Sequence, residues 1–215
     1  MMQFFVSTGL AKGLGPHVKP NKNLEPSLLW RADVAQIGAD TCVVAQEVYS
    51  KYIMVFCGLD REGFRNFPEL FRERFWREAT ALCLQGTNFE QDSLIGSLSS
   101  LCDQQHYQLD PIPREEDRIM NITEKLERQF LYEKQPLPID GKAAFKFGIQ
   151  VNGHKRQRDG QPSAPSPMEL FRGACLDLVE DALEQGTFMV PSNSAVISEV
   201  DNVVTVDFGR NRKAS

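Results

Sequence analysis

The chain has 215 residues, of which 41% are hydrophobic and 25% charged, and it carries a formal net charge of −5 at pH 7. This length and composition exclude a fibrous or wholly disordered protein, and they predict a globular core of ordinary size. The acidic balance argues against the broad positive surface of a protein that binds duplex nucleic acid.

The apolar runs of the sequence are too short to cross a bilayer, and the first residues lack the basic leader and full apolar core of a signal peptide. We therefore expect a cytoplasmic protein that does not enter a membrane. Five cysteines, an odd number, stand mostly inside apolar runs, at positions 42, 57, 83, 102 and 175. This placement predicts buried, reduced thiols and not a disulfide framework.

The beginning of the chain predicts a strand followed by a short capped turn or helix. Residues 2–7, MQFFVS, are mostly apolar and predict the strand, and Ser7 or Thr8 is placed to cap the Gly-rich segment that follows. A strand before a Gly-rich turn is also typical of phosphate-binding loops. Here, however, Lys12 is not followed by Ser or Thr, and the glycine spacing fits neither the nucleotide nor the dinucleotide fingerprint.

A predicted hairpin forms the centre of the sequence. Residues 16–27 contain three prolines and predict a polar loop, and residues 28–37 predict an edge strand that leads into the hairpin. The β-branched, apolar runs 41–46 and 52–57 are separated by five residues, which is enough for a hairpin loop. Both runs are apolar on both faces, so we expect them in the middle of a sheet that is covered on each side.

A long amphipathic helix follows the hairpin. Asn66 is its expected N-cap, with Glu69 three residues later, and Gly86 is its expected end. Apolar residues recur between these positions at helical spacing. Similar patterns predict the remaining elements, which are helices over 93–106, 114–134 and 166–186 and strands over 142–151 and 202–208. Ser166, followed by Glu169 three residues later, is the expected start of the last helix.

These elements predict an α+β fold, with a central antiparallel or mixed sheet and about four flanking helices. We expect residues 1–190 to form a single domain. Within it, residues 152–167 are basic and rich in Pro and Ser, which predicts a mobile loop. Residues 191–215 are expected to form a C-terminal extension.

Several segments, in this order, give the sequence a distinctive pattern. They are STGLAKGL after the first strand, Trp30-Arg31-Ala32, the hairpin TCVVAQEVYSKYIMVFCGL, the helix after 64–67, IGSLSSL (95–101) and ITEKLERQF (122–130) leading to Pro136. This pattern resembles an uncharacterised bacterial family, a domain of unknown function. The resemblance covers residues 1–180 and implies a compact α+β domain, but it transfers no catalytic residue. The loop HKRQRDGQPSAPSP and the tail after residue 190 depart from the family pattern.

The best candidate for chemistry is the pair Cys102 and His106. On the predicted 93–106 helix these residues, four positions apart, share one face. A thiol beside an imidazole is the beginning of a nucleophile and its base, or half of a zinc site. No second Cys or His pair at metal spacing accompanies them, so the alternative is a core cysteine with His106 at the helix end. We expect no metal and no cofactor.

Basic residues gather in two segments and are candidates for binding a partner. No aromatic residues are interleaved with them, which argues against a site for single-stranded nucleic acid. A solvated loop is the alternative explanation. The residues are His154, Lys155, Arg156 and Arg158 in the predicted loop, and Arg210, Arg212 and Lys213 in the tail.

The sequence contains no convergent set of catalytic residue types. We therefore expect a non-catalytic, cytosolic bacterial protein that acts by binding another macromolecule, most directly another protein, such as a regulator or inhibitor carried on a mobile element. Two alternatives stay open. One is an enzyme of unrecognised type that uses Cys102 and His106, and the other is a nucleic-acid-binding protein that uses residues 154–158 and the basic tail.

Overall fold

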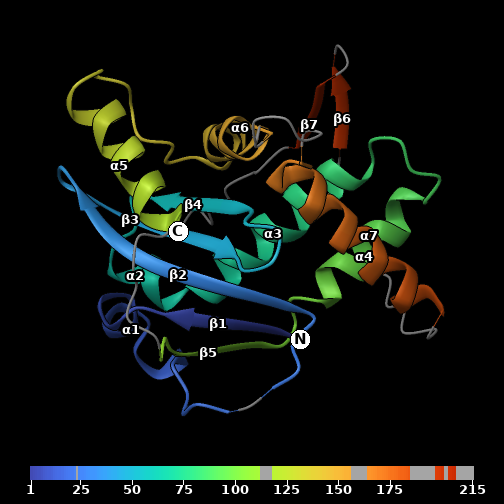
Figure 1. Cartoon of the computed structure of the whole chain (residues 1–215), viewed down its shortest axis with the longest axis horizontal. Helices are drawn as coiled ribbons and strands as arrows, with labels where there is room; N and C mark the ends of the chain where they lie inside the picture. Colours follow the sequence, from blue (N-terminus) through green and yellow to red (C-terminus); the bar gives the residue numbers. More distant parts are fainter. Residues whose placement is uncertain (23, 112–117, 156–163, 185–196, 201–202, 207–215) are drawn as a thin grey trace, which may run out of the picture.

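The computed structural model describes residues 1–22, 24–111, 118–155, 164–184, 197–200 and 203–206. Its central strands are β1 Met2–Val6, β2 Leu28–Ile37, β3 Asp40–Glu47, β4 Ile53–Cys57 and β5 Gln105–Leu109. They form one mixed sheet with the order β4-β3-β2-β1-β5 (Figure 1). Strand β1 is parallel to both β2 and β5, whereas β3 is antiparallel to β2 and β4. The predicted α+β fold is confirmed.

Helices surround this sheet in the described part of the chain. They are α1 Thr8–Leu14, α2 Arg61–Arg65, α3 Phe67–Cys83, α4 Gln91–Ser100, α5 Arg118–Leu131, α6 Gly141–Asn152 and α7 Pro167–Glu184. A 3-10 turn, η1 Gly15–His17, follows α1, and β6 Ile197–Val200 pairs separately with β7 Val203–Val206. Among the described helices, none combines the length and the apolar character needed to span a membrane.

One face of the sheet is buried beneath an aromatic core. Trp30 on β2 and Phe71 on α3 have ring centroids 5.0 Å apart, and Tyr52 beside β4 stacks on Phe171 of α7 at 4.2 Å. Leu10 of α1 and side chains of α4 complete this core. Burial of such rings is the largest apolar contribution available to a domain of this size. Helices α1, α3, α4 and α7 therefore cover this face.

The opposite face carries a second, aliphatic core. Val44 of β3 and Val55 of β4 pack there with Ile122 of α5 and Phe147 of α6. The hairpin is consequently apolar on both faces, as its sequence predicted. Among the described residues, this second core contains no member of β1 or β5. The part of this face formed by β1 and β5 is therefore not covered in the same way.

Two predicted strand positions are wrong. We expected β3 and β4 in the middle of the sheet and β2 at its edge, but β4 is an edge strand and β2 lies between β1 and β3. An apolar run shows that a strand is covered on its faces, but not whether both of its hydrogen-bonding sides are occupied. The pairing of β2 with β1 follows from the crossover through α1, which brings distant segments together.

Side chains form hydrogen bonds with backbone groups on the outer edge of β4. The Asn152 Nδ2 group donates to the Ile53 carbonyl at 2.9 Å, while its Oδ1 accepts from the Ile53 N–H at 2.9 Å. Arg74 donates to the carbonyl of Val55 and forms an ion pair with Glu78. Exposed strand edges invite pairing with other chains, and these contacts remove that opportunity at two residues of β4.

Two secondary-structure predictions are also wrong. Residues 142–151 form helix α6 and not a strand, and Asp140 caps its first turn by accepting from the Ala143 N–H at 2.8 Å. Its apolar residues pack against β4, which a short apolar segment does not reveal by itself. The predicted 93–106 helix ends at Ser100 as α4, and the chain then forms β5 beside β1. Together with the short helices α1 and α2, this makes the helix content larger than expected.

Several local predictions are confirmed. The hairpin pairs as β3 and β4, and α3 occupies the expected long helix. Ser7 caps α1, since its Oγ accepts from the Leu10 N–H at 3.2 Å. Ser166 and Glu169 form a reciprocal capping box at the start of α7. Asn66, by contrast, makes no side-chain capping hydrogen bond at the start of α3.

Candidate functional site

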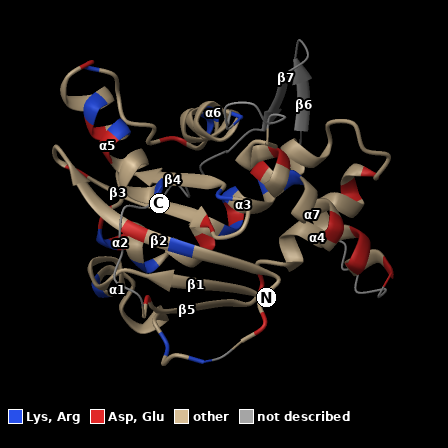
Figure 2. Ribbon diagram, viewed as in Figure 1, with Lys and Arg blue, Asp and Glu red and all other residues tan. Residues whose placement is uncertain are grey.

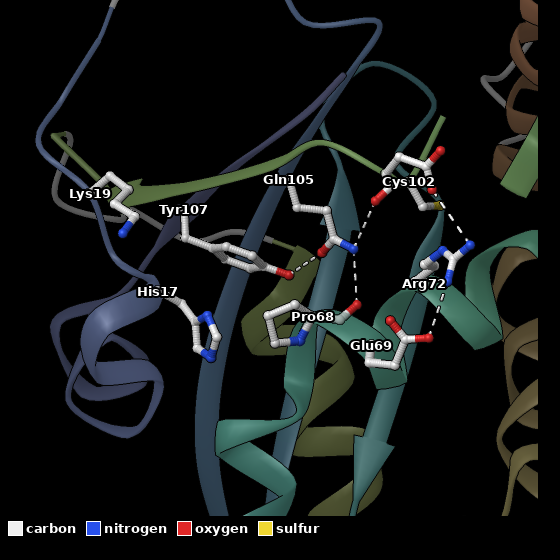
Figure 3. A pocket seen from close by; sticks show the side chains of 9 residues that line it. His17, Lys19, Pro68, Glu69, Arg72, Cys102, Gln105 and Tyr107 are labelled. Carbon is white, nitrogen blue, oxygen red and sulfur yellow. Dashed lines mark hydrogen bonds and ion pairs between the residues drawn. The ribbon is translucent and has the colours of Figure 1, made fainter. Parts of the chain in front are cut away.

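A cavity of about 370 Å³ opens beside β5, and we call it the charged cavity (Figure 3). Figure 3 shows Lys19 and His17 on one side of it and Arg72 on the other, with Tyr107 and Gln105 between them. Segments that are distant in the sequence converge here because β5 is paired with β1. The lining residues are His17 and Lys19, then Pro68, Glu69 and Arg72 of α3, Cys102 and Asp103 after α4, and Gln105 and Tyr107 of β5.

The floor of the charged cavity is held by hydrogen bonds. The Tyr107 hydroxyl donates to Gln105 Oε1. Gln105 Nε2 donates to the carbonyl of Pro68 at 2.9 Å and to that of Cys102 at 3.2 Å. Burial raises the pKa of Tyr107, so its hydroxyl stays protonated as the donor. The Gln105 amide joins the start of α3 to the turn before β5, and this makes the floor rigid.

The rim of the charged cavity carries charges of both signs. Arg72 lies 3.2 Å from Glu69 and 3.5 Å from Asp103, and these two carboxylate side chains are 63% and 59% exposed. Ion pairs in such solvated positions contribute little to stability and exchange readily. In the part of the chain that the structure describes, no carboxylate lies within ion-pair distance of Lys19. Lys19 and Arg72 are therefore available to an incoming group.

His17 contributes a polar group at the same side of the cavity as Lys19. Its Nε2 lies 2.8 Å from the Arg65 carbonyl oxygen. Because a carbonyl can only accept, we assign the proton of the neutral ring to Nε2, which leaves Nδ1 as an acceptor. His17 can thus accept a hydrogen bond while its ring is held in place.

The predicted Cys102–His106 pair does not form. Cys102 belongs to the aromatic core on the Tyr107 side of the sheet, whereas His106 alternates with Tyr107 along β5 and points to the other side. The Cys102 thiol donates to the Leu98 carbonyl at 3.7 Å, and burial raises its pKa. The shared helical face assumed for the two residues does not exist, because the helix ends at Ser100. Cys102 is a buried, protonated thiol.

The predicted partner-binding loop is only partly described. His154 and Lys155 are exposed, and the Lys155 ammonium lies 3.3 Å from Glu169 at the start of α7, a helix that carries several acidic residues (Figure 2). The other predicted residues, Arg156, Arg158, Arg210, Arg212 and Lys213, lie outside the described residues.

The described residues contain no group of three His, Cys, Asp or Glu side chains arranged to hold a metal ion. All five cysteines lie in the described part of the chain, and all are free and buried. No family model and no curated protein matches the chain. The resemblance to an uncharacterised bacterial family is therefore still an expectation from the sequence.

Sequence reasoning missed most of the charged cavity. The sequence places His17 in a predicted loop and Arg72 on an amphipathic helix, and nothing near either residue indicates a binding site. Gln105 and Tyr107 fell in or near a predicted helix end. Only the placement of β5 beside β1 brings these residues together, and no local sequence pattern predicts that pairing.

Proposed function

We propose that this protein is non-catalytic and acts by binding another protein, with an acidic side chain of the partner entering the charged cavity between Lys19 and Arg72. The observation that carries the proposal is the placement of these two cations on opposite sides of a cavity with a rigid floor. A preorganised site of this kind loses little conformational entropy on binding. A cytoplasmic location belongs to the proposal, since free thiols persist in reducing compartments.

The chemistry of the floor supports recognition over catalysis. Gln105 uses its carbonyl and both of its N–H groups in hydrogen bonds within the protein. The thiol of Cys102 has a raised pKa, and a protonated thiol is a poor nucleophile. The groups that stay available, Lys19 and Arg72, are those that bind anions.

The acidic residues of the rim favour a protein partner over a nucleic acid. Glu69 and Asp103 flank Arg72, so a continuous run of phosphates would meet two negative charges at the mouth of the cavity. A protein surface can place one carboxylate between the cations and basic groups opposite Glu69 and Asp103. Such complementary charges set partner choice and the rate of association.

The test is a charge reversal at Lys19. Immobilised parent protein and a Lys19→Glu variant are used to capture proteins from lysate of the source cells, and the bound proteins are quantified by mass spectrometry. We expect one protein captured by the parent in stoichiometric amount and reduced at least about tenfold by the variant, a change of roughly 1.4 kcal/mol. Lys12→Glu, an equal change at an exposed residue of α1 that does not line the cavity, is the matched control.

Two results would contradict this proposal. If the parent and Lys19→Glu capture the same proteins equally, the charged cavity is not the contact surface. If the parent instead captures nucleic acid, and a rise in salt releases it steeply, the nucleic-acid alternative replaces the protein partner.

A further inference from the structure

A second cavity of about 450 Å³ lies on the opposite side of β5, and we call it the amide cavity. Its floor consists of Gln3 and Phe5 of β1, Leu29 of β2 and Gln108 of β5, and Lys22 and Tyr49 stand at its sides. Its volume is within the range of small-molecule sites, roughly 300 to 1,000 Å³. It occupies the part of the sheet that the aliphatic core of α5 and α6 does not cover.

The strand register places the floor side chains next to one another. Gln3 is paired with Leu29, and Phe5 is paired with Gln108. Because successive side chains alternate, these four residues share the face opposite Phe4 and Tyr107 of the aromatic core. The floor is therefore a patch of two amides, one aromatic ring and one aliphatic side chain.

The two amides on the floor of the cavity lack protein partners for most of their groups. Gln3 and Gln108 are each only 4% exposed. Gln108 Oε1 accepts from the Lys22 N–H at 3.0 Å, which identifies its other end as the NH2 group. Within the described residues, neither this NH2 group nor the Gln3 side chain has a hydrogen bond to protein. Both side chains line the cavity, so these amide groups are available to a ligand there.

Tyr49 supplies an aromatic surface at the side of the same cavity. It is 77% exposed in the turn between β3 and β4. The turn is held beside the floor, since the Val48 N–H donates to the Leu29 carbonyl at 2.8 Å. Among the described residues that line the cavity, Lys22 carries the one charge. The cavity thus offers amide groups, an available ring face and a single cation.

We propose that the amide cavity binds a nucleobase, whose hydrogen-bonding edge is read by Gln3 and Gln108 while Tyr49 stacks on its ring and Lys22 meets its phosphate. Glutamine amides pair with base edges, with adenine as their preferred base. Bases taken out of a stack are commonly bound against aromatic side chains on a sheet. A sugar would use the amides equally well, but it has no planar ring face for Tyr49.

The test is titration calorimetry with four probes: adenosine 5′-monophosphate, adenosine, ribose 5-phosphate and a hexa-adenylate strand. We expect the monophosphate to bind with a Kd below about 1 mM, adenosine to bind several-fold more weakly, and ribose 5-phosphate not to bind. No binding of either the monophosphate or the strand overturns the proposal. Equal binding of ribose 5-phosphate also overturns it, because the base would then contribute nothing.

The hexa-adenylate probe shows whether the bound base comes from a nucleic acid or from a free nucleotide. Binding of hexa-adenylate more than about tenfold tighter than the monophosphate assigns the site to a nucleic acid, and equal binding assigns it to a free nucleotide. Both results support a nucleobase site.

Variants distinguish a loss of binding at the amide cavity from a general loss of folding. Gln3→Leu removes an amide without a protein partner and keeps the volume filled, so we expect a folded protein that binds the monophosphate about tenfold more weakly. Tyr49→Ala, at an exposed position, should cause a similar loss. Gln150→Leu, on the exposed face of α6, is the matched control and should bind as the parent does. If Gln3→Leu and Tyr49→Ala also bind as the parent does, the proposal is wrong.

Binding of the monophosphate at the amide cavity is independent of the protein partner proposed for the charged cavity. Lys19 lines the charged cavity and not the amide cavity, so Lys19→Glu should leave binding of the monophosphate unchanged. Failure of one proposal therefore leaves the other standing.

Discussion

The two edges of the sheet are protected in different ways. At β4, Asn152 and Arg74 occupy outward-facing backbone groups of Ile53 and Val55 directly, under the cover of α6. At β5, the segment that follows η1 runs alongside the strand instead. There the Lys19 N–H donates to the Tyr107 carbonyl at 2.7 Å.

The two edges contribute to different properties of the protein: the β4 edge to stability and the β5 edge to binding. Asn152 is completely buried, so water cannot replace its hydrogen bonds. The β5 edge instead has a cavity on each side, and its polar side chains lie within reach of solvent. Buried polar contacts are costly to lose, whereas groups near water can be satisfied again. We infer that the β4 edge serves the fold and that the β5 edge carries the surface available to partners.

The largest effect is expected at the β4 edge. Asn152→Ala leaves the N–H and carbonyl of Ile53 buried without partners and should lower the free energy of unfolding by about 3 kcal/mol. Urea denaturation monitored by circular dichroism measures it. Asn66→Ala is the control, because its exposed side chain makes no capping bond, and it should change stability by less than about 0.5 kcal/mol. A loss below about 1 kcal/mol for Asn152→Ala would show that water reaches the β4 edge.

A smaller loss is expected at the β5 edge. Tyr107→Phe removes the donor to Gln105 Oε1, and water in the charged cavity can take its place. We expect a loss of about 1 kcal/mol in the same urea experiment. Tyr132→Phe, at a largely exposed tyrosine, should have no measurable effect. A loss for Tyr107→Phe as large as that for Asn152→Ala would remove the distinction between the two edges.

The rate at which Cys102 is alkylated tests whether the charged cavity gives access to a reactive thiol. Burial raises its pKa above the ordinary thiol value of 9.0, so at pH 8.5 it holds less thiolate than a small thiol does. We expect iodoacetamide to label Cys102 no faster than the folded protein opens, as followed by peptide mass spectrometry. Denatured protein is the control. Labelling of the folded protein at the rate of a free thiol would restore the enzyme alternative.

The smallest effect on stability is expected away from both edges. Replacing Lys155, Arg156 and Arg158 together by Ser should leave the urea midpoint unchanged, because the Lys155–Glu169 ion pair is exposed. A lower midpoint would show that the segment is packed. The same variant, used for capture beside Lys19→Glu, measures how far the basic loop adds to binding at the β5 edge. Capture equal to the parent would restrict binding to the charged cavity.

Features that depend on neighbouring residues were predictable from the sequence. The reciprocal bonds of Ser166 and Glu169 at the start of α7 follow from their spacing, and the apolar runs of the hairpin predicted its pairing. Burial of the five thiols followed from their apolar surroundings. These features depend on hydrogen bonds and side-chain periodicity within a few residues, and both can be read along the chain.

The tertiary structure alone decided the strand order, the identity of α6 and both cavities. The spacing of Ala144, Phe147 and Val151 fits a helix, but the short apolar segment also fits a strand, and its packing against β4 selected the helix. Gln3 and His106 become neighbours only when β5 pairs with β1. Such pairings depend on which surfaces are buried together across the whole domain, and the residues on either side of β5 do not encode them locally.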